Sequence, residues 1–174
     1  MFKGIVVGVV GTGVVALVVA LVLVLTGRVP INADTQPPAL ERWAAMTDLH
    51  ALLAREAPPG PNPLPATDEN LEAGVEIFAH SCAGCHGASD GRPSRVARGL
   101  YQEPPQLAKH GVEDDPPGYT WWKVHHGIRW TAMPSFGKSL SRDQIWQVTL
   151  FLQHMDSLPA AARQVWQEVP GVGG

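Results

Sequence analysis

The distribution of apolar and polar positions separates one long apolar run from the rest of the chain. Gly4 to Thr26 contains no charged residue and is rich in Val and Leu. As a helix rising about 1.5 Å per residue, this run reaches roughly 35 Å, enough to cross a hydrocarbon core of about 30 Å. The apolar region of a cleaved signal peptide is only about 7–15 residues long, so we predict a retained membrane helix. Cleavage after a weak site at Ile31-Asn32-Ala33 remains the alternative.

The rest of the chain shows apolar residues at helical spacing and no alternating strand pattern. Thr67 is placed to cap a helix, Ser141-Arg142-Asp143-Gln144 forms a capping box, and Gly127 is a helix stop. The fold class is therefore all-α. Helices are predicted at Pro37 to Glu56, Asp68 to His80, Trp121 to His126, Arg142 to Leu158 and Ala160 to Val169.

We divide the chain into four parts: a signal anchor or transmembrane helix (1–27), a juxtamembrane helix and linker (28–66), one compact domain (67–159) and a C-terminal tail (160–174). The helix from Pro37 to Glu56 is amphipathic and could pack on the domain, lie at the membrane surface or contact a partner. Five prolines between Ala57 and Ala66 predict a semi-rigid spacer of about 30 Å if this segment is extended.

Composition narrows the function only slightly. The chain has 174 residues, 45% apolar content and a formal net charge of −3. These values fit one small domain with attachments and exclude a basic nucleic-acid binder. Arg92, Arg95 and Arg98 follow one another closely, and solvated loops or a docking surface both remain open for them.

The most specific chemistry lies in Cys82-Ala83-Gly84-Cys85-His86, which contains the only two cysteines of the chain. The C-x-x-C-H pattern is typical of covalent c-type haem attachment. Two cysteines three apart on a helical turn face the same way, so their sulfurs can bond both vinyl groups of one haem. His86 then lies under the ring and can ligate the iron.

Two other interpretations of this motif fit the sequence less well. A dithiol redox motif normally lies where a strand meets a helix, and the sequence predicts no strand there. A structural zinc site takes four ligands, and no second C-x-x-C or paired histidines follow at the required spacing. Haem attachment is the interpretation that we prefer.

Met133 is the candidate for a second axial ligand. It lies between Gly127 and Gly137 on a segment that reads as a loop, and Pro134 after it disfavours a helix. His125 and His126 are alternatives, although neighbouring residues on a helix point in different directions. Trp122 is expected to form a wall of the haem pocket.

Cys82 to His86, the loop containing Met133 and the following aromatic-bearing helix together resemble the class I cytochromes c over residues 67–159. The resemblance implies an all-α fold around one covalent haem c, with His86 as proximal ligand and Met133 as distal ligand. In that family a proline carbonyl in a Pro-x-Leu segment hydrogen-bonds the proximal imidazole, and Pro105-Gln106-Leu107 matches this segment. Arg129 on the distal loop could reach a haem propionate or be solvated.

The resemblance implies an electron-transfer protein rather than an enzyme, with the haem domain on the extracytoplasmic, periplasmic side and redox proteins as partners. Small residues recur every fourth position along the apolar run, which favours close packing against another membrane subunit. We therefore expect a fixed subunit of a respiratory or photosynthetic complex. The alternatives are a haem sensor or small-ligand binder with a displaceable Met133, and a structural subunit whose haem is incidental. The small residues are Gly4, Gly8, Thr12, Ala16 and Ala20.

Overall fold

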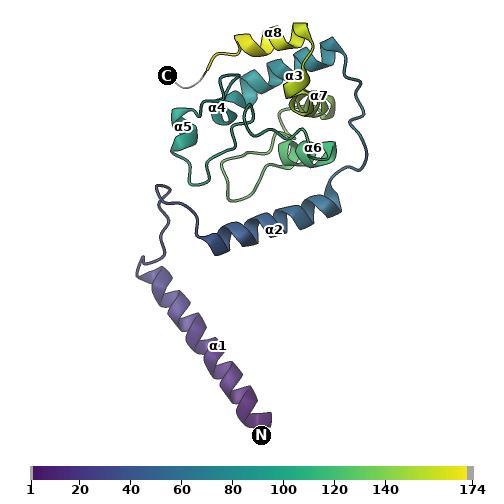
Figure 1. Cartoon of the computed structure of the whole chain (residues 1–174). Coiled ribbons are helices and arrows are strands. Elements are labelled where there is room, and N and C mark those ends of the chain that lie inside the picture. The colour runs from purple at the N-terminus through teal and green to yellow at the C-terminus, as the bar shows by residue number, and fades with distance from the viewer. Residues whose placement is uncertain (1, 172–174) are drawn as a thin grey trace. The chain divides into compact units, whose positions relative to one another are not determined.

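The structure is a computed structural model that describes residues 2–171, and every regular element in that range is helical (Figure 1). The chain divides into two units, Met1–Asn32 and Ala33–Gly174. The first unit contains α1 (Phe2–Leu25). The second contains α2 (Ala39–Glu56), α3 (Asp68–Ser81), α4 (Ala83–His86), α5 (Arg95–Arg98), α6 (Pro117–His126), α7 (Arg142–Gln153), the 3-10 helix η1 (Met155–Ser157) and α8 (Ala160–Glu168).

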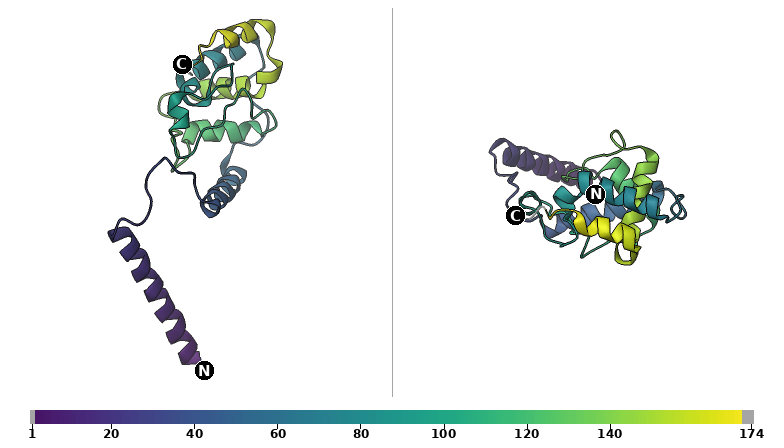
Figure 2. Two further views of the ribbon diagram at one scale, coloured as in Figure 1. Left: turned by 60° about the vertical axis from the view of Figure 1, so that its left-hand side comes forward. Right: turned by 90° about the horizontal axis from the view of Figure 1, so that it is seen from above.

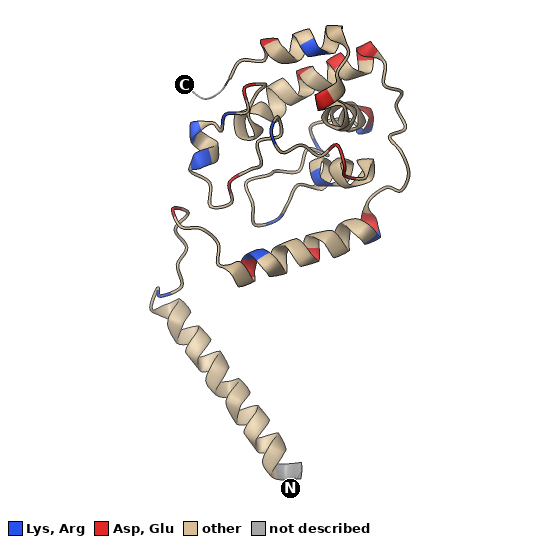
Figure 3. Ribbon diagram, in the orientation of Figure 1, with Lys and Arg blue, Asp and Glu red and all other residues tan. Residues whose placement is uncertain are grey.

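Helix α1 has the length and composition to cross a membrane over Gly4–Leu25. Figure 3 shows no Lys, Arg, Asp or Glu along this stretch. The hydroxyl of Thr12 donates to the carbonyl oxygen of Gly8 at 3.0 Å, so this polar group is satisfied within the helix. A membrane helix needs such internal satisfaction because lipid offers no hydrogen-bond partner.

The core of the second unit is built on the packing of α3 against α7. Gly74 makes the close approach possible: a Cβ built on it would lie against the carbonyl oxygen of Gln147 and 2.7 Å from Cβ of Phe151. Phe78 fills the adjoining space edge-on to Phe151, with ring centroids 5.5 Å apart. Both phenylalanines are fully buried.

Helix α8 closes this core, although the sequence placed it in a C-terminal tail. Trp166 is 6% exposed and lies edge-on to both Phe78 and Phe151. Ala162 is fully buried on the same helix. Residues from Ala160 to Val169 therefore pack with the domain, because the indole completes an aromatic cluster that α3 and α7 leave open.

The predicted caps are confirmed, and two helix limits differ. The Thr67 hydroxyl accepts from the amide of Asn70, and Ser141 and Gln144 form the expected capping box. Helix α6 begins at Pro117, earlier than the predicted Trp121, because proline suits the first helical position. Helix α7 ends at Gln153, and a separate 3-10 turn carries the chain onward before Pro159.

The segment between α2 and α3 lies on the domain. The side-chain amide of Asn62 donates to the carbonyl oxygen of Trp146 at 3.0 Å, and the carbonyl of Pro58 faces Gly118 so closely that a Cβ there would clash. Leu53 of α2 is 2% exposed within the core. The proline-rich spacer is therefore fixed along the surface of the domain. Its prolines restrict the backbone, and these contacts hold it in place.

Arg95 and Arg98 lie on the short helix α5, where the sequence indicated a loop (Figure 3). The Ser94 hydroxyl caps this turn by accepting from the amide of Ala97 at 3.0 Å. Arg92, Arg95 and Arg98 are all exposed, as expected for solvated arginines.

We predict that Gly74→Val lowers the free energy of unfolding by about 3 kcal/mol, because its side chain must displace the backbone of α7. Denaturant unfolding followed by circular dichroism measures this change. Glu76→Val, which places the same side chain on the exposed face of α3, is the matched control and should change stability far less. Equal stability of the two variants would contradict the close approach of α3 and α7.

Candidate functional site

The two cysteines lie on one tight turn between α3 and the following loop. Cys82 ends α3 and begins α4, and its carbonyl oxygen accepts from the amides of Cys85 and His86 at 3.0 and 2.9 Å. Gly87 ends the turn with φ +78°, a conformation that favours glycine. Residues three apart on a helical turn are neighbours on one face, so both thiols are presented together.

The environment of Cys82 disfavours the charged thiolate. Burial, reinforced by the neighbouring Cys85, raises the pKa of Cys82 to about 12. A metal ligand or an exchanging dithiol requires a thiolate, which this site disfavours, whereas a thioether carries no charge. Within the described residues, no group of three or more His, Cys, Asp and Glu side chains could hold a metal ion. The raised pKa of Cys82 weakens the dithiol interpretation, and the result for metal-binding groups weakens the zinc interpretation.

The imidazole of His86 is held by the loop before α6. Its Nδ1 lies 2.9 Å from the carbonyl oxygen of Pro105. Because a carbonyl can only accept, Nδ1 carries the hydrogen, and the lone pair of Nε2 is left available for a metal. Burial lowers the pKa of His86, although the bond to Pro105 acts in the opposite sense. A lowered pKa favours the neutral imidazole, which is the form that binds iron.

Two buried side chains that the sequence analysis did not identify hold the turn in place. The side-chain nitrogen Nε2 of Gln106 donates to the carbonyl oxygen of Cys85 at 3.2 Å and to that of Pro104 at 3.0 Å. The Ser94 hydroxyl donates to the carbonyl oxygen of Gly84 at 2.7 Å. Gln106 is the middle residue of the Pro-x-Leu segment, which is the only signal that could have indicated it; Ser94 had none.

Met133 lies on a loop that closes on itself after α6. The amide of Ile128 donates to the carbonyl oxygen of Met133 at 3.1 Å, and the amide of Met133 donates to the Thr131 hydroxyl at 3.1 Å. Gly127 begins this loop with φ +69°. The Met133 side chain is partly buried against the hydrophobic core, and Cys82 packs against the same core.

The other residues that the sequence analysis considered for the haem site differ in their exposure to solvent. Trp122 is 8% exposed and belongs to the core cluster. Arg129 is exposed on the Met133 loop. His125 stacks on Trp121 with ring centroids 4.6 Å apart, and His126 lies against Trp122 at 4.7 Å. Both histidine rings thus pack on tryptophans of α6.

The donor set fits a covalently attached haem. Two cysteines lie three residues apart, burial raises the pKa of the Cys82 thiol, and the neutral imidazole beside them has an orienting hydrogen bond at Nδ1 that leaves Nε2 available. Such a second partner for a metal-binding histidine fixes the ring and raises its basicity.

Comparison with protein families agrees with this geometry. Residues 69–152 match the family model Cytochrome_CBB3, described as cytochrome c oxidase, cbb3-type, subunit III. The matched range begins in α3, includes the attachment turn and the Met133 loop, and ends in α7. No match was found among curated proteins.

We predict that haem stays with the wild-type polypeptide through denaturation and acid extraction, because thioether bonds survive both treatments. Cys82→Ser combined with Cys85→Ser should release it. Haem staining after denaturing electrophoresis measures retention, and Ser81→Ala, next to the turn, is the control that should retain haem. Extractable haem in the wild type would contradict covalent attachment.

Proposed function

Residues 69–152 are a c-type cytochrome domain, and from this premise we propose that the chain transfers electrons through one covalent haem ligated by His86 and Met133. The observation that carries the proposal is the hydrogen bond between Nδ1 of His86 and the carbonyl of Pro105, next to the two cysteines. This bond supports the proposal because it orients a neutral imidazole beside the two cysteines to which a haem would be bonded.

A haem bound there supplies one-electron chemistry by cycling its iron between the ferrous and ferric states. The residues of the chain would limit the structural rearrangement that accompanies each change of oxidation state. Pro105 holds the His86 ring in one orientation, and the closed loop limits the movement of Met133. A neutral thioether ligand also raises the reduction potential relative to more basic ligation.

We place the domain outside the cytoplasm, anchored by α1. Helix α1 is long and apolar enough to span a membrane. Attachment of haem to a C-x-x-C-H motif is, by resemblance to the cytochromes c, an extracytoplasmic process. The donor and acceptor of the electrons would then be proteins at or in the same membrane.

We further propose that the chain is a fixed subunit of a membrane oxidoreductase. The matched family model is described as a subunit of a cbb3-type cytochrome c oxidase, and this favours a respiratory complex. The small residues that recur at every fourth position of α1 support the same idea, since they leave one side of the helix without bulky side chains. Another helix could therefore approach this side of α1 closely.

We predict that the oxidised protein shows the sulfur-to-iron charge-transfer band in its absorption spectrum and that Met133→Leu abolishes it, because leucine has no donor atom. The variant should also bind carbon monoxide, with at least a tenfold gain in affinity. Met155→Leu, the same change in a core residue outside the loop, is the matched control and should keep the band. Ready binding of carbon monoxide by the wild type would favour the haem sensor instead.

We predict that Gly8→Leu combined with Ala16→Leu removes co-purifying membrane subunits without changing haem content, because the larger side chains prevent close helix packing. Val10→Leu combined with Val18→Leu, on the opposite side of α1, is the control that should retain them. Affinity purification from solubilised membranes measures the association. Unchanged association in the first variant would show that α1 acts only as a tether.

A further inference from the structure

One face of α2 is buried at its C-terminal end and open at its N-terminal end. Arg42, Met46, Leu49 and Leu53 are separated by four, three and four residues, which places them on the same side of a helix. Leu53 is 2% exposed, and Leu49 is partly buried against the core. Met46 is 46% exposed, and Arg42 is exposed. The same stripe thus continues past the part that the domain covers.

The open half of α2 is hydrogen-bonded to the loop that leads to Pro105, the residue whose carbonyl binds His86. Tyr101 lies three residues before Pro104, and its hydroxyl donates to Oε2 of Glu41 at 3.0 Å. The other end of α2 packs against α6, the helix that precedes the Met133 loop. Helix α2 therefore connects the loop that holds His86 with the helix that carries the Met133 loop.

The figures place α2 at one end of the cytochrome domain. Figures 1 and 2 show α2 across the domain from α3, α7 and α8, with the connecting loops between them. The α3–α7 end is closed and apolar, since Val75, Phe78 and Phe151 are fully buried. The α2 end carries polar groups, the exposed Arg42 and Glu41 and the half-buried Tyr101, beside the exposed apolar side chains of Trp43 and Met46.

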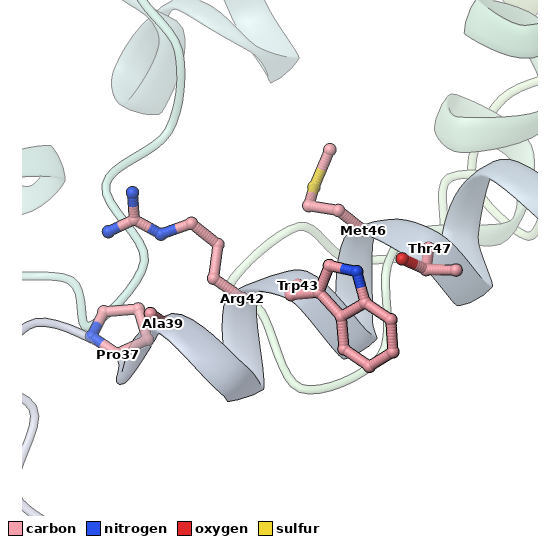
Figure 4. Close-up of a pocket in the computed structure, with 6 residues that line it drawn as sticks. All are labelled: Pro37, Ala39, Arg42, Trp43, Met46 and Thr47. Carbon is pink, nitrogen blue, oxygen red and sulfur yellow. The ribbon is translucent and has the colours of Figure 1, made fainter.

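The side chains at the open half form a pocket. Figure 4 shows Arg42 and Met46 extending from the same side of α2. Among the described residues, the side-chain ion pairs are Arg55 with Glu56 and Lys123 with Asp115, so the guanidinium of Arg42 has no acidic partner there. The pocket is lined by Pro37, Ala39, Arg42, Trp43, Met46 and Thr47.

We propose that this pocket receives the propionate edge of the haem, with Arg42 pairing with a propionate and Met46 packing against the edge of the ring. The proposal rests on the function proposed above and deepens it. A haem has an apolar body and two carboxylates at one edge, and the closed α3–α7 end cannot accommodate carboxylates without a large desolvation cost. The planar guanidinium of arginine matches a carboxylate in geometry and charge.

The methionine and the helix suit the same occupant. Methionine is flexible and polarizable, so it adapts to the face or edge of a large aromatic ring. Helix α2 lies outside the matched range 69–152, so it is an addition of this chain to the cytochrome domain. Helix α2 would thus cover one edge of a haem that residues 69–152 bind.

The pairing would also set the reduction potential. An ionised propionate near the iron stabilises the ferric state through its negative charge, and a nearby guanidinium offsets that charge. Arg42 would therefore favour the ferrous state and raise the potential. A guanidinium that is fully solvated and not paired with a propionate would have a much smaller effect, because water and salt screen its charge.

Nuclear magnetic resonance of the reduced, haem-loaded, full-length protein in detergent micelles tests the contact. The four methionine methyl groups are labelled with ¹³C and assigned by Met→Leu variants. We expect the Met46 methyl to be shifted by the ring current and to show a nuclear Overhauser effect to the haem propionate methylene protons. A Met46 methyl without shift or contact would overturn the proposal.

The same spectrum separates this proposal from the proposed function. A Met133 methyl shifted far upfield shows that the sulfur ligates the iron, whatever Met46 does. Loss of the Met133 shift with normal Met46 contacts would contradict the ligation alone. Loss of the Met46 contacts with a shifted Met133 methyl would contradict the role of α2 alone.

Redox titration tests Arg42. Arg42→Gln should raise the ratio of oxidised to reduced protein several-fold at a fixed applied potential, where a tenfold rise is about 59 mV for one electron. Arg55→Gln, on the same helix but paired with Glu56, is the matched control and should leave the ratio unchanged. Equal potentials for the two variants and the wild type would show that Arg42 does not pair with a propionate.

Discussion

The hydrogen bond between Nδ1 of His86 and the carbonyl of Pro105 is the interaction on which the rest of the site depends. It joins two segments 19 residues apart and determines which nitrogen of the ring can bind a metal. Gln106 strengthens the same junction, because its side chain connects the carbonyl oxygens of Cys85 and Pro104. The attachment turn and the loop after α5 therefore behave as one structural unit.

The helical core supports this unit. Cys82 is the last residue that α3 positions, and α3 is held by its close approach to α7 at Gly74 and by the aromatic cluster of Phe78, Phe151 and Trp166. A shift of α3 along α7 would move the cysteines relative to Pro105. Packing far from the motif is thus part of the geometry of the site, since close-packed interiors transmit displacements.

Features set by short-range chemistry could be predicted from the sequence. The Thr67 cap, the capping box at Ser141 and the stop at Gly127 each depend on residues within one helical turn, and the structure contains all three. The start of α6 was missed because the apolar pattern begins at Trp121, whereas the helix begins with Pro117. The C-x-x-C-H motif was evident because its spacing can be read directly from the sequence.

Features that join distant parts of the chain could not be predicted. The bonds from Gln106 and Ser94 to backbone carbonyls leave no periodic pattern in the sequence. Trp166 could have packed in the core or faced a partner, and only the arrangement of α3 and α7 decides for the core. The division of α2 into a covered half and an open half likewise depends on where the domain ends, which no local signal records.

We propose that the iron of the haem has one histidine and one methionine ligand, His86 and Met133. X-ray absorption at the iron edge of the purified, haem-loaded protein tests it directly by identifying the atoms bonded to the metal. The account predicts one sulfur and five nitrogen neighbours in both the oxidised and the reduced protein. Six nitrogen neighbours, or a sulfur that leaves the iron on reduction, would contradict it.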